Sequence, residues 1–456
     1  MRSEWVRIGI LCLALILVSL GLTLLKAEVA FAANPSGRAA AISTVANAKS
    51  APATIDPGTA ITMENWRQFK QFMPDGMVAL FEGRYFWKMP PDVRMVVGPT
   101  VINPLPKNYL AATEKFSSQT RIVALPDGGR TLTGYGGGVP FPKPAAPDQG
   151  WKILADYWYR YFPHLVVNTP DNLGFSCTQD PYGSINCLKS LWVYRQLSFN
   201  TDAGVLATIP GGEGKFYTIW AMVEEPEQAK YTTTLTIGYA DLSKPQDIFE
   251  FKPALRRTER LSSAARCATS GSDTTPDDGR FGFNGNIPEF NATLAGERKI
   301  LSQMNVGTAG GRFPEDYDMA LGWPKPGWGK WELRDVYVID VRKIPARAQG
   351  YCYGKRIMYI DKQFYGALWE DLYNAKMKLW KVALLQPIVL KVPGIGMQNL
   401  SGAQYSHYWD LDDHHATYSG PADGHGYDVL INQDAPKEYE DIERYTTPGG
   451  LTEVMR

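Results

Sequence analysis

The sequence predicts a mainly β (α+β) protein with one large antiparallel sheet, which is either strongly curved or an open barrel. Apolar and polar residues alternate along many short segments, as is typical of half-buried strands. The 456 residues include 24 Tyr, 18 Phe and 13 Trp, which favour strands, together with 43 Gly and 32 Pro, which favour turns. Hydrophobic residues make up 44% of the chain, which is enough for a large core.

The N-terminus has the pattern of a secretory signal peptide over residues 1–32. Arg2 and Arg7 precede an apolar run at 8–25, and small residues around Ala32 match an A-x-A-type cleavage site. We therefore expect export to the periplasm with cleavage after Ala32. The apolar run is also long enough to span a bilayer, so an uncleaved inner-membrane anchor is the alternative.

Residues 33–60 are interpreted as a disordered linker, because Ala, Ser, Pro and Thr dominate there without periodicity. The remainder, 61–456, is expected to form a single large domain. Short helices are expected at 62–72 and 150–161, where aromatic residues recur at helical spacing.

Strands dominate from residue 191 onward. Each expected strand combines aromatic or β-branched residues with period-2 alternation. Before the strongest pattern in the chain, expected strands lie at 191–199, 215–223, 231–239, 248–251, 290–303 and 331–341. A final strand is expected within 401–418.

The strongest strand pattern lies between Lys355 and Ala383. Alternation runs through 356–361, 367–373 and 378–383, with turn-like residues between the runs. Short turns between such runs predict an antiparallel meander. One face of each strand is apolar and aromatic, and the other carries Lys, Glu and Asp. The apolar face must be covered by another sheet, a helix or a ligand.

Four cysteines lie outside the N-terminal apolar run, and an even number in an exported chain suggests disulfides. Cys177 and Cys187 flank a short loop with turn-forming pairs, so we expect them to pair. Cys267 and Cys352 would then form the second bridge. Four buried free thiols are the alternative. No zinc site is expected, because no Cys-x-x-Cys or nearby Cys–His spacing occurs.

Charge and motifs exclude several functions. The chain has 47 basic and 47 acidic residues without a basic stripe, so nucleic acid is not an expected partner. No G-x-S-x-G motif occurs, and His164 has no evident nucleophile partner. Glu370 and Asp371 are adjacent on a strand and point to opposite faces. We therefore expect no catalytic site and no cofactor.

Several sequence blocks carry a resemblance to a known family. They are Asn65 with Pro74-Asp75-Gly76, GGVPFPKP at 137–144, FKPALRRTERL at 251–261, DDGRFGFNG at 277–285, WELRDVYVIDV at 331–341 and KRIMYIDKQFYGALWEDLY at 355–373. The chain resembles domain-of-unknown-function family 1329 of exported bacterial proteins. That family is similar in fold to periplasmic lipoprotein carriers and outer-membrane receptors (LolA/LolB-like). Two departures are Trp151, which lacks the Asn and His that usually follow, and an apparent addition at 323–331.

The resemblance implies a strongly bent antiparallel half-barrel with two or three helices on its concave face. A hydrophobic cavity would lie between the sheet and these helices. Members of the family are often encoded beside an outer-membrane β-barrel protein and a resistance-nodulation-division exporter, which implies traffic of hydrophobic molecules across the envelope. No established activity comes with the resemblance.

Aromatic residues on the expected strands are the first candidate ligand-binding residues. They are Trp220, Tyr359, Trp369 and Trp380. Most such residues fill a core, but some could line a cavity of lipid size.

Arg256 and Arg257, followed by Arg260, are the second candidates. Guanidinium groups bind anionic head groups through paired hydrogen bonds. The alternative is a solvated hairpin end in which Glu250 and Glu259 are their partners.

A histidine-rich segment near the C-terminus invites a metal interpretation. It holds His407, His414, His415 and His425, with several Asp residues nearby. Adjacent histidines on a strand point to opposite faces, and a loop with polar tips explains them equally well. We expect no metal site.

We therefore expect non-catalytic binding or transfer of a hydrophobic molecule, such as a lipid or lipoprotein, in the periplasm or at the outer membrane. The alternative is a structural or assembly partner of an outer-membrane β-barrel and exporter system, with its cavity filled by its own side chains. A third hypothesis is an envelope metal protein or enzyme that uses the histidine-rich segment.

Overall fold

The computed structural model describes residues 53–261, 266–267, 274–275, 277–279, 282–304, 306, 313–319, 322–421 and 429–455. The expected signal peptide, most of the expected linker, and His425 lie outside the described residues. The packed part of the chain begins earlier than the predicted linker boundary at residue 60. Ile55 is already buried in the core, and strand β1 begins at Ala60.

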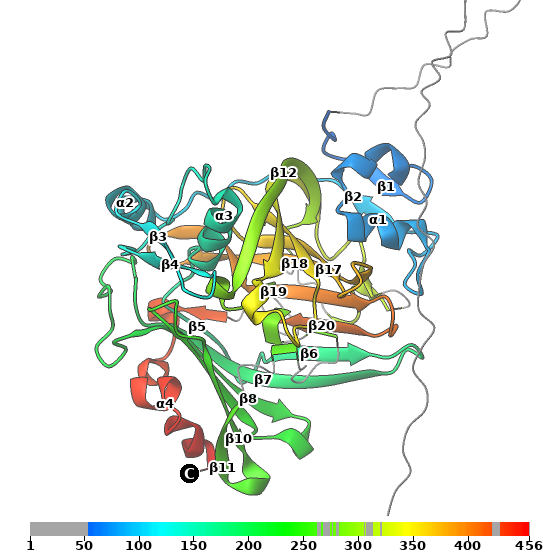
Figure 1. Ribbon diagram of the computed structural model, residues 1–456. Coiled ribbons are helices and arrows are strands. Elements are labelled where there is room, and N and C mark those ends of the chain that lie inside the picture. Colours follow the sequence, from blue (N-terminus) through cyan, green and yellow to red (C-terminus); the bar gives the residue numbers. More distant parts are fainter. Residues whose placement is uncertain are drawn as a thin grey trace, which may run out of the picture. The chain divides into compact units, whose positions relative to one another are not determined.

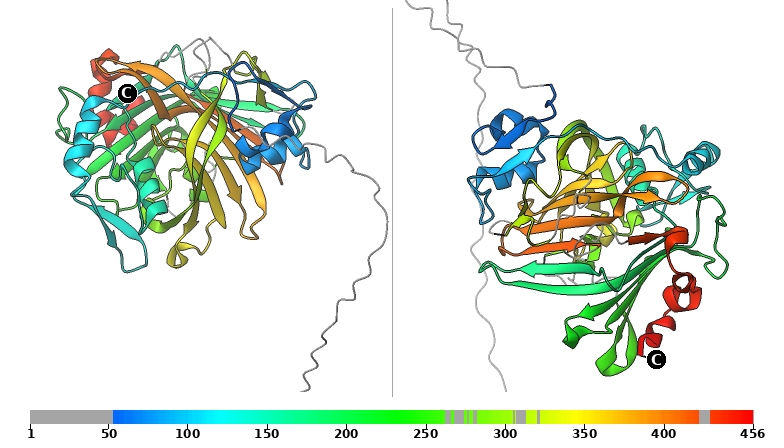
Figure 2. Two further views of the ribbon diagram at one scale, coloured as in Figure 1. Left: turned by 90° about the horizontal axis from the view of Figure 1, so that it is seen from above. Right: turned by 180° about the vertical axis from the view of Figure 1, so that it is seen from behind.

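Fifteen strands form one sheet in which every strand pairing is antiparallel (Figure 1). The strands are β5 (Leu165–Asn168), β6 (Gly174–Gln179), β7 (Ile185–Gln196), β8 (Lys215–Glu225), β9 (Thr233–Tyr239), β10 (Asp247–Lys252), β11 (Arg257–Leu261), β12 (Phe290–Gln303), β15 (Trp331–Lys343), β16 (Lys355–Asp361), β17 (Ala367–Tyr373), β18 (Leu379–Val392), β19 (Gly396–Asp410), β20 (Ala416–Gly420) and β21 (Val429–Ile431). Their order is β11-β10-β9-β8-β7-β6-β20-β19-β18-β17-β16-β15-β12, with β5 and β21 attached beside β7. The two ends of this path do not pair, so the sheet is open. Figure 2 shows that it bends strongly along its width.

Shorter elements surround the sheet. Three two-stranded sheets join β1 (Ala60–Thr62) to β2 (Arg94–Val96), β3 (Arg121–Ala124) to β4 (Arg130–Thr133), and β13 (Tyr317–Asp318) to β14 (Trp323–Pro324). The longer helical elements are η1 (Trp66–Phe72), α1 (Asp75–Glu82), α2 (Lys107–Phe116), α3 (Gln149–Trp158), α4 (Ile442–Thr446) and η10 (Gly450–Met455). The predicted mainly β fold with one large bent antiparallel sheet is confirmed.

Two local expectations need correction. The expected helix at 62–72 is only a 3₁₀ helix over Trp66–Phe72, because the Asn65 side chain accepts a hydrogen bond from the Thr62 N–H and closes a turn there. The single strand expected within 401–418 is the hairpin β19–β20. Its turn forms where Asp410 accepts hydrogen bonds from the backbone N–H groups of the two following aspartates, 412 and 413.

The two faces of the sheet are both covered by the rest of the chain. On one face, α1 packs on β17 and β18, and α4 packs on β7, β8 and β9. On the other face, α3 packs on β12 and β15. In the β16–β18 meander this burial includes two acidic residues, since Glu370 on one face and Asp371 on the other are both fully buried. The helices therefore divide between the two faces, as the views in Figure 2 show.

The N-terminus of α1 is anchored to the meander by Asp371. The carboxylate accepts hydrogen bonds from the Gly76 N–H at 3.0 Å and from the Tyr359 hydroxyl at 2.9 Å. Gly76 is required for this approach, because a Cβ at that position would lie 2.7 Å from a methyl group of Val382. Burial raises the pKa of Asp371 to about 7, although the two hydrogen bonds act in the opposite direction.

Both expected disulfides are present in the structure. Cys177 on β6 lies directly opposite Cys187 on β7 and is bonded to it. Cys267 is bonded to Cys352, which lies 85 residues further along the chain. The first bridge fastens the β6–β7 hairpin, and the second fastens the segment before β12 to the segment before β16.

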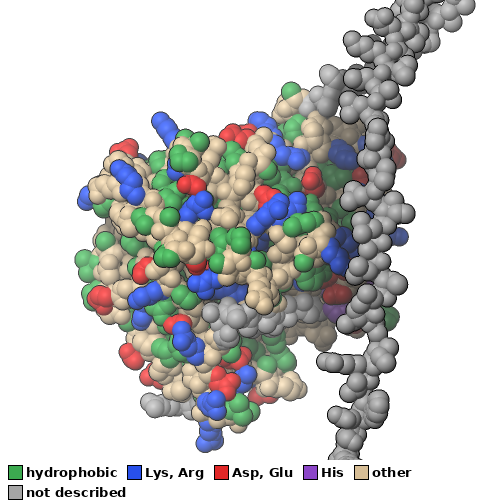
Figure 3. All heavy atoms as spheres, in the orientation of Figure 1, with side chains coloured by type: hydrophobic (Ala, Val, Ile, Leu, Met, Phe, Trp, Pro, Cys, Tyr) green, Lys and Arg blue, Asp and Glu red, His purple; other side chains and the backbone are tan. Residues whose placement is uncertain are grey.

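The surface carries charges of both signs. On the face shown in Figure 3, basic and acidic side chains are interspersed, in keeping with 47 residues of each kind. Among the residues that the structure describes, no helix combines the length and the apolar character needed to cross a bilayer.

Replacing Cys177 and Cys187 together by Ser is expected to lower the free energy of unfolding by about 3 kcal/mol. The reason is that the bridge closes a loop in the unfolded chain and so reduces its conformational entropy. Urea denaturation of the oxidised wild type and the double variant measures the difference. Peptide mapping without reductant should find the two peptides linked. Free thiols at both positions in oxidised protein would refute the bridge.

Asp371→Asn is expected to change how stability depends on pH. A carboxyl whose folded pKa is raised from about 3.9 to about 7 contributes stability that is fully present below about pH 4 and is lost as the pH rises to about 7. Relative to the variant, the wild type should therefore lose up to about 1.4 kcal/mol per pH unit in this window. Urea denaturation at several pH values tests this, and parallel curves for the two proteins would contradict it.

Candidate ligand-binding site

A cavity of about 350 Å³ lies against one face of the sheet, over β6 to β9 and β19 to β20. Strand register explains which residues reach it. Trp192 pairs with Ala221, and Ala221 pairs with Thr234, so these side chains share one face. Ser406 and Ser419 pair in the same way on the neighbouring strands. Further along the sheet, the Glu370 side chain on β17 lies on this same face, and α3 packs against it on β12 and β15.

Most of the side chains around the cavity are small, hydroxylated or aliphatic. The sheet residues with these properties are Ser176, Leu188, Ser190, Ile219, Ala221, Val223, Thr232, Thr234, Ser406, Thr417 and Ser419. Small side chains leave space where larger ones would close the core. The cavity is within the size range of small-molecule sites in proteins.

An aromatic pocket of about 70 Å³ adjoins the larger cavity. The two share Trp192, Ile219 and Gly402 as lining residues. The aromatic side chains of the pocket are Trp158, Phe162, Trp192, Tyr194, Phe216, Tyr217 and Phe283. Gly402 lies where a register shift leaves 401–403 without partners in β18, and a Cβ there would come within 2.7 Å of the Phe162 ring. The site therefore has a roomy part and a narrow aromatic part.

Charge is scarce in this site. Glu250 is the charged side chain among the described residues that line the larger cavity, and its carboxylate is paired with Lys252 at 2.9 Å. Arg160 lines the aromatic pocket, where its guanidinium donates to the Tyr157 carbonyl at 2.7 Å and to the Ser401 hydroxyl. Glu250 therefore has a counter-ion, and the guanidinium of Arg160 is held by two neutral oxygens. Most of the lining is uncharged, so the site suits a largely apolar ligand.

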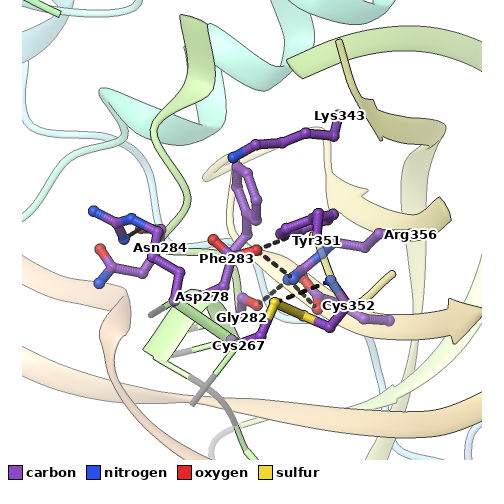
Figure 4. A network of polar contacts seen from close by, with 12 residues as sticks. Cys267, Asp278, Gly282, Phe283, Asn284, Lys343, Tyr351, Cys352 and Arg356 are labelled. Carbon is purple, nitrogen blue, oxygen red and sulfur yellow. Dashed lines mark hydrogen bonds and ion pairs between the residues drawn. A yellow bond between two sulfur atoms is a disulfide. The ribbon is translucent and has the colours of Figure 1, made fainter. Parts of the chain in front are cut away.

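One wall of the site consists of residues 277–279 and 282–290, which Arg356 on β16 holds against the sheet (Figure 4). The guanidinium donates to Glu370 and to the Gly282 carbonyl, both at 2.9 Å, and to Asp278 at 3.2 Å. Tyr351 also donates to Asp278, and the Cys267–Cys352 bridge lies beside this network. Burial raises the pKa of Glu370 to about 8, although Arg356 opposes the shift.

Tyrosine hydroxyls from the sheet and from α3 donate hydrogen bonds to the same wall. The Tyr408 hydroxyl donates to the Gly279 carbonyl at 2.7 Å, and the Tyr157 hydroxyl on α3 donates to the Phe283 carbonyl at 2.9 Å. Gly279 and Phe283 both line the site. The wall is therefore fixed from the sheet and from α3 at once.

The four aromatic candidates from the sequence do not come together, and none lines these two cavities. Trp220 packs against Tyr445 of α4, with ring centroids 5.2 Å apart. Tyr359 and Trp369 lie in the core beneath α1, on the face opposite the cavity. Trp380 packs on Tyr353 and donates to Asp410. These four side chains pack against other parts of the protein and not against the two cavities, because strand phase alone does not show which face the chain itself covers.

The arginine candidates lie at the β10–β11 hairpin, with neither Arg256 nor Arg257 lining these cavities. Arg257 pairs with Glu259 at 3.0 Å, and Arg260 pairs with Asp247. Arg256 occupies the turn with a φ of 46°. This arrangement matches the alternative of a solvated hairpin end.

The described histidines of the C-terminal segment do not assemble a metal site. His407 is fully buried among aromatic rings, and burial lowers its pKa to about 3. His414 stacks on Phe86 with ring centroids 4.6 Å apart. Among the described residues, no group of three or more His, Cys, Asp and Glu side chains could hold a metal ion.

Sequence reasoning missed the residues that line the cavity. Their only signal is the alternation of hydroxyl and aliphatic side chains in 231–239, where Thr232 and Thr234 face the cavity and Leu235 faces the core. The local sequence pattern does not distinguish a strand face that lines a cavity from one that is exposed to solvent. This face is covered by the wall at 277–279 and 282–290, which comes from a distant part of the chain.

Comparison with known proteins gives a family and similar solved structures. No curated protein matches the chain. A structure of a DUF1329 family protein from Desulfovibrio piger has a TM-score of 0.43 at 12% identity, and the match covers 66% of this chain and 100% of that one. A domain described as an outer membrane lipoprotein-sorting protein, from Vibrio parahaemolyticus, has a TM-score of 0.42 at 12% identity, covering 64% and 95%. A LolA superfamily protein from Nitrosomonas europaea has a TM-score of 0.37 at 14% identity, covering 66% and 99%.

Because these TM-scores lie below 0.5, the likenesses carry no conclusion about function. The family itself is established by the sequence. The model of the family described as protein of unknown function, DUF1329, matches residues 60–451. The chain therefore belongs to the DUF1329 family, as its sequence blocks predicted.

Proposed function

We propose that this protein binds a hydrophobic molecule without chemically changing it. The observation that carries the proposal is the cavity of about 350 Å³, with its adjoining aromatic pocket, on a sheet face whose other half is closely packed. Apolar and small uncharged side chains line most of it; Glu250 is paired with Lys252, and Arg160 donates hydrogen bonds to neutral oxygens. Desolvating an apolar ligand in such a site is favourable, whereas a charged ligand would lose hydration without compensation.

The place of action that we propose is the periplasm or the outer membrane. The support is the signal-like pattern at 1–32 and the two disulfides, which are stable in oxidising compartments. A carrier with such a site could move a lipid or the acyl chains of a lipoprotein between membranes. An outer-membrane β-barrel and an exporter of the resistance-nodulation-division class are the partners that we propose for this role.

A second candidate function is that of an assembly partner for an outer-membrane β-barrel. The observation that favours it is Tyr182, which is 93% exposed at the tip of the β6–β7 hairpin that the Cys177–Cys187 bridge stiffens. An exposed aromatic residue on a stiff hairpin is suited to contact a partner. This role does not need the cavity to be occupied, so ligand binding separates the two candidates.

Ala221→Trp is expected to abolish binding by filling the cavity. Ala221 points into it from β8, so an indole there would occupy the space that a ligand needs. The neutral fluorescent probe N-phenyl-1-naphthylamine should bind the wild type, and its affinity should fall at least about tenfold in the variant, which corresponds to about 1.4 kcal/mol.

Ala375→Trp, in the exposed turn between β17 and β18, is the matched control and should bind the probe as the wild type does. Thermal melting of all three proteins shows whether they are folded. Equal probe binding by the two Trp variants would mean that the probe does not occupy this cavity. No binding by the folded wild type would refute the carrier function and favour the assembly role.

A further inference from the structure

Gln404 on β19 lines the larger cavity, and its carboxamide is left without hydrogen bonds. The residue is only 7% exposed. Neither Oε1 nor Nε2 has a partner among the residues that the structure describes. A buried donor and a buried acceptor that both stay unpaired are unfavourable, and native proteins rarely keep such a group without a function.

Several polar groups that line the site with Gln404 already have hydrogen-bond partners. Ser406, two residues further along the same face, shares a hydrogen bond with Ser419 at 2.7 Å. The Trp192 indole donates to the Pro421 carbonyl at 3.2 Å. The Asn284 side chain at the aromatic pocket accepts from Tyr217 and Gln246. Gln404 therefore offers a molecule in the cavity an unpaired donor and an unpaired acceptor on one side chain.

Other buried glutamines in this protein show what a structural carboxamide does. Gln179 donates to the Met319 carbonyl and accepts from the Tyr418 hydroxyl. Gln386 donates to Gln303 and accepts from Tyr317. Gln398, on the same strand as Gln404 and 4% exposed, donates to the Pro104 carbonyl at 2.9 Å. Against this background the unpaired state of Gln404 is a local exception, and it occurs in the cavity.

The charges near the cavity restrict what Gln404 can bind. A carboxylate or phosphate would need a cation, and Lys252 is already paired with Glu250 while Arg160 is held by a carbonyl and a hydroxyl. The Glu250 carboxylate would also repel an anion. The polar group that meets Gln404 is therefore uncharged.

We propose, building on the ligand-binding function above, that Gln404 anchors the hydroxyl group of an uncharged, otherwise apolar alcohol. A hydroxyl is both a donor and an acceptor, so it can donate to Oε1 and accept from Nε2 of one carboxamide. The apolar body of the ligand then extends along Ile219 and Trp192 into the aromatic pocket. The substrate class is a long-chain or polycyclic alcohol and excludes free fatty acids and anionic phospholipids.

Competition with N-phenyl-1-naphthylamine tests this selectivity. Dodecan-1-ol should displace the probe from the wild type at about a tenfold lower concentration than dodecanoate, and dodecyl phosphate should compete no better than dodecanoate. Equal or stronger competition by either anion would overturn the alcohol assignment. If the probe binds but the alcohol has no advantage, the proposed function survives and this inference fails.

Gln404→Leu separates a binding role from a structural one. The variant should lose most of the advantage of dodecan-1-ol, about tenfold, while its affinity for the probe stays within about twofold. Its melting temperature should rise, because an unpaired buried carboxamide is replaced by an apolar group of similar size. Gln398→Leu is the control and should melt at a lower temperature with unchanged selectivity. A Gln404→Leu protein that melts lower than the wild type and keeps its preference for the alcohol would show that Gln404 is structural.

Discussion

The buried ion cluster of Arg356 with Glu370 and Asp278 is the interaction on which the site depends. All three side chains are at most 2% exposed, so none can rely on water to stabilise its charge. Removing Arg356 would leave two buried carboxyl groups without a counter-ion, which is typically more costly than the cluster is worth. Arg356 also holds the Gly282 carbonyl, so the cluster fixes the segment that forms one wall of the cavity. Without that wall, the face of β6 to β9 would be an open sheet surface.

The two faces of the sheet differ in how densely their side chains pack. On the face beneath α1, large rings pack closely; Trp323 stacks on Trp331 with ring centroids 5.4 Å apart, and Trp369 lies beside both. On the other face, the strands that carry Ala221 and Thr234 present small side chains, and a cavity remains. Because the face beneath α1 and the α3 half of the other face are both densely packed, the remaining part can keep a cavity and an unpaired group such as Gln404.

Strand patterning in the sequence predicted much of the fold, because period-2 alternation is a local property. The segment 290–303 is β12 over its full length, and the first two runs of the meander match β16 and β17. The pairing of Cys177 with Cys187 followed from their short separation in the chain. Membership of the DUF1329 family was predicted from the sequence blocks that resemble that family.

The site could not be predicted in the same way, because it depends on which faces are covered. Alternation placed Glu370 on a polar face, yet that face is buried beneath a segment that brings Asp278 to Arg356. The same limit misplaced Trp220 and Trp369, which are aromatic and on strands but face the packed side. A cavity made of small residues from six strands has no contiguous sequence signal. Only the tertiary structure shows that Gln404 is buried and unpaired.

Native mass spectrometry of the protein purified from its own cell envelope tests the central claim most directly. The account predicts a population whose mass exceeds that of the polypeptide by one small hydrophobic molecule, which organic extraction releases and which carries no net charge. A mass equal to that of the polypeptide alone, with nothing in the organic extract, would contradict the claim that the cavity is a ligand site.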